Sequence, residues 1–346
     1  MVTWKRVVLM AAIVSMPVAA GAGEKLAIAS WGGAYAQSQS KAFFDPFRNT
    51  GVDVTITDYQ DEPAAIGTAL ASRGAAPDVI EIDTQTALMA CSEGLLEKID
   101  WKKLGLEREK FTGASQQNCA VPSIVFGTVL AYDASKFKPG PMRTADLFDL
   151  KAFPGKRALR KSPLVNLEWA LIADGVSQAD VYKVLRTKAG IDRAFKKLDT
   201  IKDQIVWWTD GAEPAKLLGT GAAAMASAWN GRITVAVQKD KKPFAIVWDN
   251  EGLDWVCWAI VKGSPNKDTG YRFIAFASDP GRLAGLAGDI AYGPANKDAG
   301  AKIGNSALAD LPTAPANMKT ALIVDAKFWA ANGDVLNERF KAWLGK

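Results

Sequence analysis

The sequence predicts an α/β protein built from two lobes with a ligand cleft between them. Strand-like and helix-like segments alternate from residue 25 onward, which is typical of a parallel sheet wrapped by helices. The chain has 346 residues, more than the ~250 that a single core usually holds. Two long apolar segments, 119–133 and 254–261, suit strands that cross from one lobe to the other.

The first lobe begins with three strand–helix pairs. The apolar or alternating runs predict strands, and the runs with helical spacing, two of them closed by glycine, predict helices. The predicted strands are 25–30, 52–59 and 77–83, and the predicted helices are 36–47, 62–74 and 84–94. Ligands of such sheets bind beyond the carboxyl ends of the strands, so the loops SWGGAY, TDYQDE and EIDTQT become candidate binding loops.

The second lobe follows a loop rich in proline and glycine, KFKPGPMRT. Its predicted strands are 155–160, 204–208, 222–229 and 244–249. Its predicted helices are two amphipathic ones, 166–175 and 188–201, and a short one at 215–221. Residues 271–287 predict a helix and 318–346 a helix pair. We therefore expect residues 23–130 and 257–300 in lobe 1, and 131–256 and 301–346 in lobe 2.

Residues 1–22 predict a cleaved export signal. Lys5 and Arg6 precede an apolar stretch, and the small residues Ala20 to Ala22 suit cleavage. A membrane anchor is the alternative, but Pro17 and the short apolar run disfavour a span of ~20 residues. Loss of Lys5 and Arg6 from the 42 basic residues leaves a charge of +3 against 37 acidic residues. This balance does not indicate nucleic-acid binding, and the KDKK run at 239–242 predicts a solvated loop.

Cysteine and histidine usage restricts the possible chemistry. Three cysteines in an exported chain favour a Cys91–Cys119 disulfide with Cys257 buried and free, and three small buried hydrophobic residues are the alternative. Histidine is absent, which excludes Ser-His-Asp and Cys-His catalysis and histidine-dependent zinc sites. No spacing indicates a carboxylate, lysine or tyrosine enzyme or a nucleotide-binding loop. We therefore expect a protein that is not an enzyme and has no cofactor.

Aromatic and charged residues at strand ends are the candidate ligand contacts. Trp31 ends the first strand and Trp229 a strand of small residues, although either could pack within its own lobe. Asp83 and Asp254 flank apolar strands and could hold an ammonium, while Asp83 could instead, or also, cap the helix that follows. Arg232 could grip a carboxylate with its planar fork or be an exposed residue at a helix start. Arg160 and Lys161 form a weaker candidate anion site.

The stretch SAWNGRI contains two of these residues and has two interpretations. Asn230–Gly231 between apolar runs favours a tight β-hairpin turn. Alternatively, residues 233–239 form a helix that leaves the strand 222–229. The second interpretation places Trp229 and Arg232 at a strand-to-helix junction, where α/β lobes present ligand contacts.

Several stretches together resemble the type II periplasmic solute-binding proteins of ABC importers, in the branch with polyamine and γ-aminobutyrate receptors. They are SWGGAY, PDVIEIDTQTALMACSEGLLEKIDW, FPGKRALR, MASAWNGRI, YRFIAFASDP and AYGPANKDA. The resemblance implies the two-lobe type II fold, hinge closure on a small ligand, delivery to an inner-membrane ABC permease, a periplasmic location and a monomer. The aromatic positions of polyamine receptors match Trp31, Tyr35, Trp229 and Tyr292. Their acidic positions match poorly, since one falls at Val256 with Asp254 as the nearest acid.

Charge decides between the ligands that this branch binds. Arg232, and Arg160 if it faces the cleft, would repel a polycation, which costs several kcal/mol in a closed cleft. A zwitterion would meet Arg232 with its carboxylate and Asp83 or Asp254 with its ammonium. We therefore expect γ-aminobutyrate or a similar ω-amino acid, with a polyamine such as putrescine or spermidine as the alternative. The expected ligand contacts are Trp31, Tyr35, Asp83, Gln85, Phe126, Trp229, Arg232, Asp254 and Tyr292.

Overall fold

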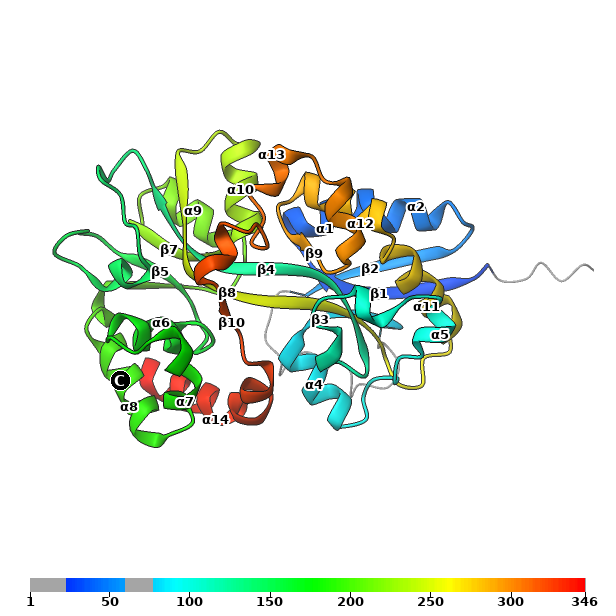
Figure 1. The fold of residues 1–346 in the computed structure, drawn as a ribbon, viewed down its shortest axis with the longest axis horizontal. Helices are drawn as coiled ribbons and strands as arrows, with labels where there is room; N and C mark the ends of the chain where they lie inside the picture. Colours follow the sequence, from blue (N-terminus) through cyan, green and yellow to red (C-terminus); the bar gives the residue numbers. More distant parts are fainter. Residues whose placement is uncertain (1–22, 60–76, 346) are drawn as a thin grey trace, which may run out of the picture.

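One mixed sheet runs through both lobes of the computed structural model, which describes residues 23–59 and 77–345 (Figure 1). Its strand order is β2-β1-β3-β8-β4-β7-β5-β6, with β9 paired to β4 and β10 to β8. The lobes occupy the two ends of this order, and the long central strands β4 and β8 connect them (Figure 1). The predicted α/β fold with two crossing strands is thus confirmed.

Lobe 1 contains the N-terminal strands and helices from two distant parts of the chain. Its strands are β1 (Lys25–Trp31), β2 (Asp53–Tyr59), β3 (Val79–Asp83) and β9 (Gly293–Pro294). Its α-helices are α1 (Gly33–Gln39), α2 (Asp45–Arg48), α4 (Thr84–Ser92), α5 (Trp101–Leu104), α11 (Lys267–Ala277) and α12 (Pro280–Asp289). β1 pairs in parallel with β2 and β3, which brings their carboxyl ends to one edge. The predicted helix 62–74 lies outside the described residues.

Lobe 2 repeats this arrangement with its own core. Its strands are β5 (Arg157–Arg160), β6 (Ile205–Trp208), β7 (Met225–Trp229) and β10 (Leu322–Ile323). Its helices are α6 (Asn166–Ala173), α7 (Val181–Leu185), α8 (Lys188–Asp199), α9 (Glu213–Gly219), α10 (Asn230–Gln238) and α14 (Ala326–Leu344), and α13 (Asn305–Leu308) lies in the connecting segment before β10. β5 pairs in parallel with β6 and β7, so these strands also end at one edge.

The ligand cleft lies where the two crossing strands connect the lobes. β4 (Ala120–Asp133) and β8 (Phe244–Ile260) are antiparallel neighbours with irregularities at Pro122/Ile124 and Thr128/Leu130. One hydrophobic cluster gathers side chains of β1, β2, α11 and α12, and another gathers side chains of α6, α8 and α14. Two cores joined by two strands are the arrangement that hinge closure requires. The boundaries after residues 130, 256 and 300 stay predictions.

Four local predictions were wrong in detail. The segments 244–249 and 254–261 are one continuous strand, β8. The helix predicted over 271–287 breaks at Pro280 into α11 and α12. The C-terminal helix pair is one helix, α14, because Leu322 and Ile323 instead pair with β8 as β10. Helix α6 is buried almost throughout rather than amphipathic, since α8 covers it.

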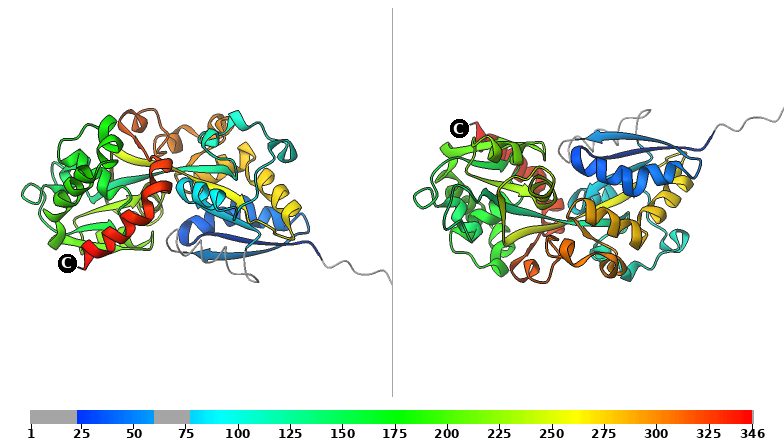
Figure 2. Two further views of the ribbon diagram at one scale, coloured as in Figure 1. Left: turned by 90° about the horizontal axis from the view of Figure 1, so that it is seen from below. Right: turned by 90° about the horizontal axis from the view of Figure 1, so that it is seen from above.

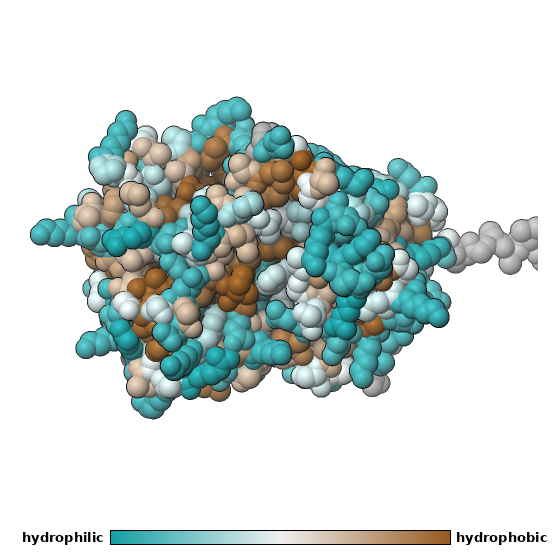
Figure 3. All heavy atoms as spheres, viewed as in Figure 1, coloured by the Kyte–Doolittle hydropathy of each residue, from teal (hydrophilic) through white to brown (hydrophobic). Residues whose placement is uncertain are grey.

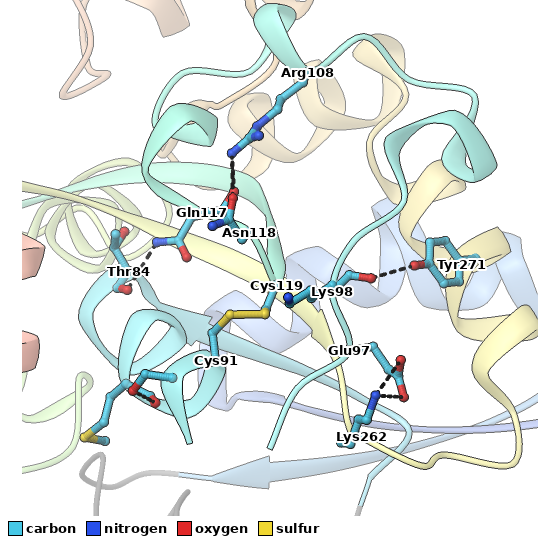
Figure 4. Close-up of a disulfide and its surroundings, with 12 residues drawn as sticks. Thr84, Cys91, Glu97, Lys98, Arg108, Gln117, Asn118, Cys119, Lys262 and Tyr271 are labelled. Atoms are coloured by element: carbon cyan, nitrogen blue, oxygen red, sulfur yellow. Dashed lines mark hydrogen bonds and ion pairs between the residues drawn. A yellow bond between two sulfur atoms is a disulfide. The ribbon is translucent and has the colours of Figure 1, made fainter. Parts of the chain in front are cut away.

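A disulfide joins α4 to the chain just before β4 in lobe 1 (Figure 4). Cys91 at the end of α4 bonds Cys119, just before β4, with 5.7 Å between their Cα atoms, and Cys257 is buried and free. This confirms the predicted pairing. The bridge fixes α4 to the start of a crossing strand, and Gln117 Nε2 donates to the Thr84 carbonyl at the other end of α4 (Figure 4). The helix that begins at a candidate ligand residue is therefore held at both ends.

The outer surface is mostly hydrophilic in the view of Figure 3, with smaller apolar patches between the charged side chains. The large exposed hydrophobic residues are scattered and comprise Met142, Met318, Ile323 and Val335. Single exposed apolar residues of this kind are ordinary for a folded protein. Within the described ranges, no helix combines the length and the apolar character needed to cross a membrane.

Candidate functional site

A cavity between the lobes collects eight of the nine predicted ligand residues. It encloses about 720 Å³ of empty space, including the solvent at its mouth. The eight residues are Trp31, Tyr35, Asp83, Phe126, Trp229, Arg232, Asp254 and Tyr292. Gln85 lines a neighbouring cavity instead and donates to Asp83 Oδ2 at 2.6 Å. Both lobes and both crossing strands contribute to the cavity, so its shape depends on how the lobes meet.

The stretch SAWNGRI is a strand-to-helix junction, not a hairpin. β7 ends at Trp229 and α10 begins at Asn230. The buried Asn230 side chain connects elements of both lobes, because its Oδ1 accepts from Gly127 N at 3.0 Å and its Nδ2 donates to the Ala291 carbonyl at 2.5 Å. The Asn230 side chain therefore links the two lobes instead of closing a turn. A Cβ at Gly231 would lie 2.6 Å from the Tyr292 ring, which explains the glycine.

Arg232 forms the basic side of the cavity and spans the two lobes. Its Nη2 donates to the Gly32 carbonyl of lobe 1 at 2.7 Å, and its Nε is buried without a hydrogen-bond partner among the described residues. The side chain is only 8% exposed, so it is not the exposed helix-start residue of the alternative interpretation. Gly33, at φ +69°, leaves room for it, because a Cβ there would lie 2.9 Å from Arg232 Nη1. Arg232 Nε is thus an unused donor in a buried place.

Aromatic rings from both lobes meet around the cavity. Trp31 of lobe 1 and Trp229 of lobe 2 pack edge to face with 5.7 Å between ring centroids. Tyr35 and Tyr292 do the same at 5.4 Å, and Phe126 on β4 lies 6.3 Å from Trp229. The pairs that include Trp229 join the lobes, and each stabilises the closed arrangement by ~0.5–1.5 kcal/mol beyond the area that it buries, whereas the Tyr35–Tyr292 pair lies within lobe 1. The rings give the cavity largely apolar walls.

Asp83 and Asp254 form the acidic side. Asp83 pairs with Val256 across β3 and β8, and Asp254 projects from the same face of β8 two residues away. Asp83 Oδ1 accepts from Thr86 N at 3.0 Å, so Asp83 caps α4 as well as lining the cavity. Asp254 Oδ1 accepts from Trp255 N at 2.7 Å, while Oδ2 is buried with no partner in the described part of the chain.

Burial raises the pKa of both carboxyls, and for Asp254 the neighbouring Asp83 charge raises the pKa further. Arg160 opposes this effect on both residues, since its positive charge lowers their pKa values. The Arg160 guanidinium also lies 5.3 Å from the Trp229 ring centroid. When both carboxyls are ionised, this side of the cavity carries one negative charge more than Arg160 neutralises. A single cation from a ligand would balance it.

The two charged sides are separated across the cavity. Asp83 and Arg160 also line a second cavity that Arg232 does not reach. Arg232, Trp31 and Trp229 line a third cavity, in which neither Asp83 nor Asp254 takes part, although Asp210 does. The cavity between them therefore has a negative and a positive side, with aromatic walls in between.

Sequence reasoning missed a buried carboxylate behind Tyr35. Glu81 is fully buried on β3 and accepts from Tyr35 Oη at 2.8 Å, from Ser30 Oγ at 2.8 Å and from Gln39 Nε2 at 2.7 Å. Burial raises its pKa to about 7, against the lowering effect of these three donors. Glu81 therefore fixes the orientation of Tyr35, which faces the cavity.

Other missed residues follow the two-residue period of the strands. Residues two positions away from a predicted contact lie on the same face of its strand and also line the cavity. They are Ile124 and Thr128 next to Phe126, Ser227 next to Trp229, and Gly252 and Val256 next to Asp254. This alternation was available from the sequence. Leu164, Val165, Asn166 and Val324 also line the cavity but lie in loops or at a helix start, where no such pattern indicates them. No group of three or more Cys, Asp or Glu within residues 23–59 and 77–345 is arranged to hold a metal ion.

Residues 41–319 match the family model described as bacterial extracellular solute-binding protein. The chain belongs to this family. A γ-aminobutyric acid-binding protein of Pseudomonas aeruginosa is 40% identical over 324 residues, which cover 93% of this chain and 92% of that protein. The family resemblance stated from the sequence is thereby confirmed.

Solved structures of similar proteins share the two-lobe fold. The periplasmic binding protein MotA of Agrobacterium tumefaciens, in complex with glucopine, superposes with a TM-score of 0.86 at 30% identity and covers 92% of this chain and 99% of its own. The Atu4243-GABA receptor superposes with a TM-score of 0.82 at 30% identity and covers 93% of this chain and 98% of its own. The names of these relatives thus state different small ligands.

Proposed function

We propose that this protein is the periplasmic receptor of an ABC importer and that it binds γ-aminobutyrate or a similar ω-amino acid by hinge closure. The observation that carries the proposal is the pair of opposed charges in one buried cavity, with Arg232 on one side and Asp83 and Asp254 on the other. The ligand carboxylate would lie at Arg232 and its ammonium at the aspartates. The names of the P. aeruginosa relative and of the Atu4243 receptor support this ligand class.

The charge count disfavours a polyamine. The aspartates and Arg160 leave room for one positive charge, and a second ammonium would lie against the buried Arg232. The cavity also offers no histidine and no group poised for nucleophilic attack, which supports binding without turnover. We expect the mature protein to act as a monomer that releases its ligand unchanged to an inner-membrane permease.

Calorimetric titration of the ligand-free mature protein tests the ligand class. The panel contains γ-aminobutyrate, 5-aminovalerate, putrescine, spermidine and butyrate, the last as a carboxylate without an amine. We expect binding of the two ω-amino acids and much weaker binding of the rest. Tight binding of putrescine without a response to γ-aminobutyrate contradicts the proposal. Recovery of unchanged ligand after long incubation tests the absence of turnover, and uptake by cells that carry or lack the receptor separates transport from a purely sensory role.

A further inference from the structure

A second cavity adjoins the acidic side of the ligand cavity. Asp83, Arg160 and Leu164 line both, so the two cavities share a wall. The second cavity encloses about 750 Å³ of empty space, its mouth included, between the first turn of α4, the loop after β5 and one face of α14. Helix α14 of lobe 2 contacts α4 of lobe 1 here (Figure 2), so this cavity also lies between the lobes.

Two polar groups of α4 in this cavity lack partners. Gln85 uses its Nε2 on Asp83, and its Oε1 is buried without a hydrogen-bond partner in the described chain. The Thr86 hydroxyl is likewise buried and unpartnered, while its backbone N–H caps onto Asp83. Both side chains are more than nine-tenths buried. Buried polar groups of this kind cost free energy unless a hydrogen-bond partner reaches them. Asp254 Oδ2 is likewise unpartnered but lines the neighbouring ligand cavity.

We propose that this second cavity is a subsite for the cationic end of ω-guanidino acids, which would bind in the same cleft as ω-amino acids. The inference rests on the proposed function, because Arg232 still has to hold the carboxylate. An ammonium has three N–H donors and a guanidinium five, in a planar fork. The guanidinium therefore adds reach and donors for Gln85 and Thr86 without adding a second charge. Arg160 and Lys161 also line this cavity, and the carboxylates of Asp83 and Asp334 in the same lining balance their two positive charges. The indole rings of Trp208 and Trp329 also line the subsite and suit a planar cation.

The ligand test uses compounds that separate length, charge and shape. 4-Guanidinobutyrate is compared with γ-aminobutyrate, with the longer ammonium 6-aminohexanoate and with the neutral planar 4-ureidobutyrate, by calorimetry on the full mature protein. We expect 4-guanidinobutyrate to bind within about tenfold of γ-aminobutyrate and more tightly than the other two. Binding of γ-aminobutyrate without binding of 4-guanidinobutyrate overturns the subsite alone. Binding of neither overturns the proposed function as well.

A variant whose side chain fills the subsite tests whether the guanidinium of 4-guanidinobutyrate binds there. Gly333 lies on α14 at the cavity, and a Cβ there meets no atom within 4 Å, so Gly333→Leu places a side chain into the subsite without backbone strain. We expect it to weaken 4-guanidinobutyrate roughly 5- to 100-fold and to leave γ-aminobutyrate unchanged. Gly288→Leu on α12, where a Cβ also meets open space, is the matched control. Equal effects of Gly333→Leu on both ligands, or none on either, overturn the subsite.

The near-isosteric Thr86→Val variant tests the unpartnered hydroxyl itself. It removes the Oγ1 but keeps the backbone N–H that caps onto Asp83. We expect the ratio of the 4-guanidinobutyrate affinity to the γ-aminobutyrate affinity to fall roughly 2- to 10-fold. An unchanged ratio contradicts the assignment of Thr86 to the subsite.

Discussion

The two charged sides of the ligand cavity are built in different ways. The acidic side comes from neighbouring strands, since Asp83 on β3 and Asp254 on β8 are held by strand pairing and by the start of α4. The basic side is built across the lobes, because Arg232 of α10 donates to Gly32 of the opposite lobe. The acidic side is therefore present whenever β3 and β8 are paired, whereas the basic side is complete only when the lobes meet.

This difference assigns separate tasks to the two sides. In the proposed binding mode, the ligand ammonium would bind the acidic side before closure, and the ligand carboxylate would then meet Arg232 as lobe 2 approaches. A ligand without a carboxylate would leave Arg232 Nε buried and unpaired, which opposes closure. Recognition of the carboxylate is thus the step that is tied to closure, and the following predictions test this asymmetry.

Arg232→Ala is expected to have the largest effect. It removes the partner of the ligand carboxylate in a buried place, so γ-aminobutyrate affinity should fall by ~2–5 kcal/mol in calorimetric titration. Arg232→Lys should recover part of this loss, because it keeps the charge but not the planar fork. Arg143→Ala, on an exposed loop residue, serves as the control. Unchanged affinity of Arg232→Ala would remove Arg232 from the site.

The acidic side should make binding depend on pH, and the basic side should not. Burial raises the pKa of Asp83 and Asp254, so folding alone favours their protonated forms and the free energy of unfolding falls as pH rises toward the raised pKa values. A ligand ammonium favours the ionised forms instead. Binding should therefore release protons, and affinity should fall by up to about tenfold per unit as pH drops below the raised pKa values.

Calorimetry in buffers of different ionisation enthalpy measures this proton release. Asp254→Asn should reduce it, whereas Glu81→Gln tests the third titrating group near the cavity, whose pKa is about 7. An equal proton release by the wild type and by Asp254→Asn contradicts the acidic-side assignment.

The asymmetry also explains what the sequence could predict. Asp83, Trp31 and Trp229 end strands, and strand ends meet at the ligand edge of a parallel sheet, so local pattern was enough to find them. The contact between Arg232 and Gly32 joins residues 200 positions apart and depends on lobe closure, which no local pattern contains. The same reason explains the C-terminal error. Residues 322–323 pair with β8, a strand that is distant in the sequence, and so do not form the helix that their local pattern predicts.

Lys239→Ala should give the smallest effect and isolate closure from ligand contact. Lys239, directly after α10, forms an ion pair with Asp289 of α12 in the other lobe at 3.0 Å, so it is not simply part of a solvated loop. Ser38 and Lys41 of lobe 1 already hold the same carboxylate. An exposed ion pair of this kind contributes ~0.2–1 kcal/mol, so ligand affinity should fall by roughly 1.5- to 5-fold, and less so at high salt.

The matched control for Lys239 is Lys41→Ala. Lys41 bonds the same Asp289, at 3.2 Å, but from within lobe 1, so its loss should leave ligand affinity unchanged. Calorimetry at low and high salt compares the two variants directly. If both lysines change affinity equally, the effect comes from the charge near α12 and not from closure. If only Lys239→Ala lowers the ligand affinity, contacts between the lobes contribute to affinity without touching the ligand. This result is expected if the basic side is complete only when the lobes meet.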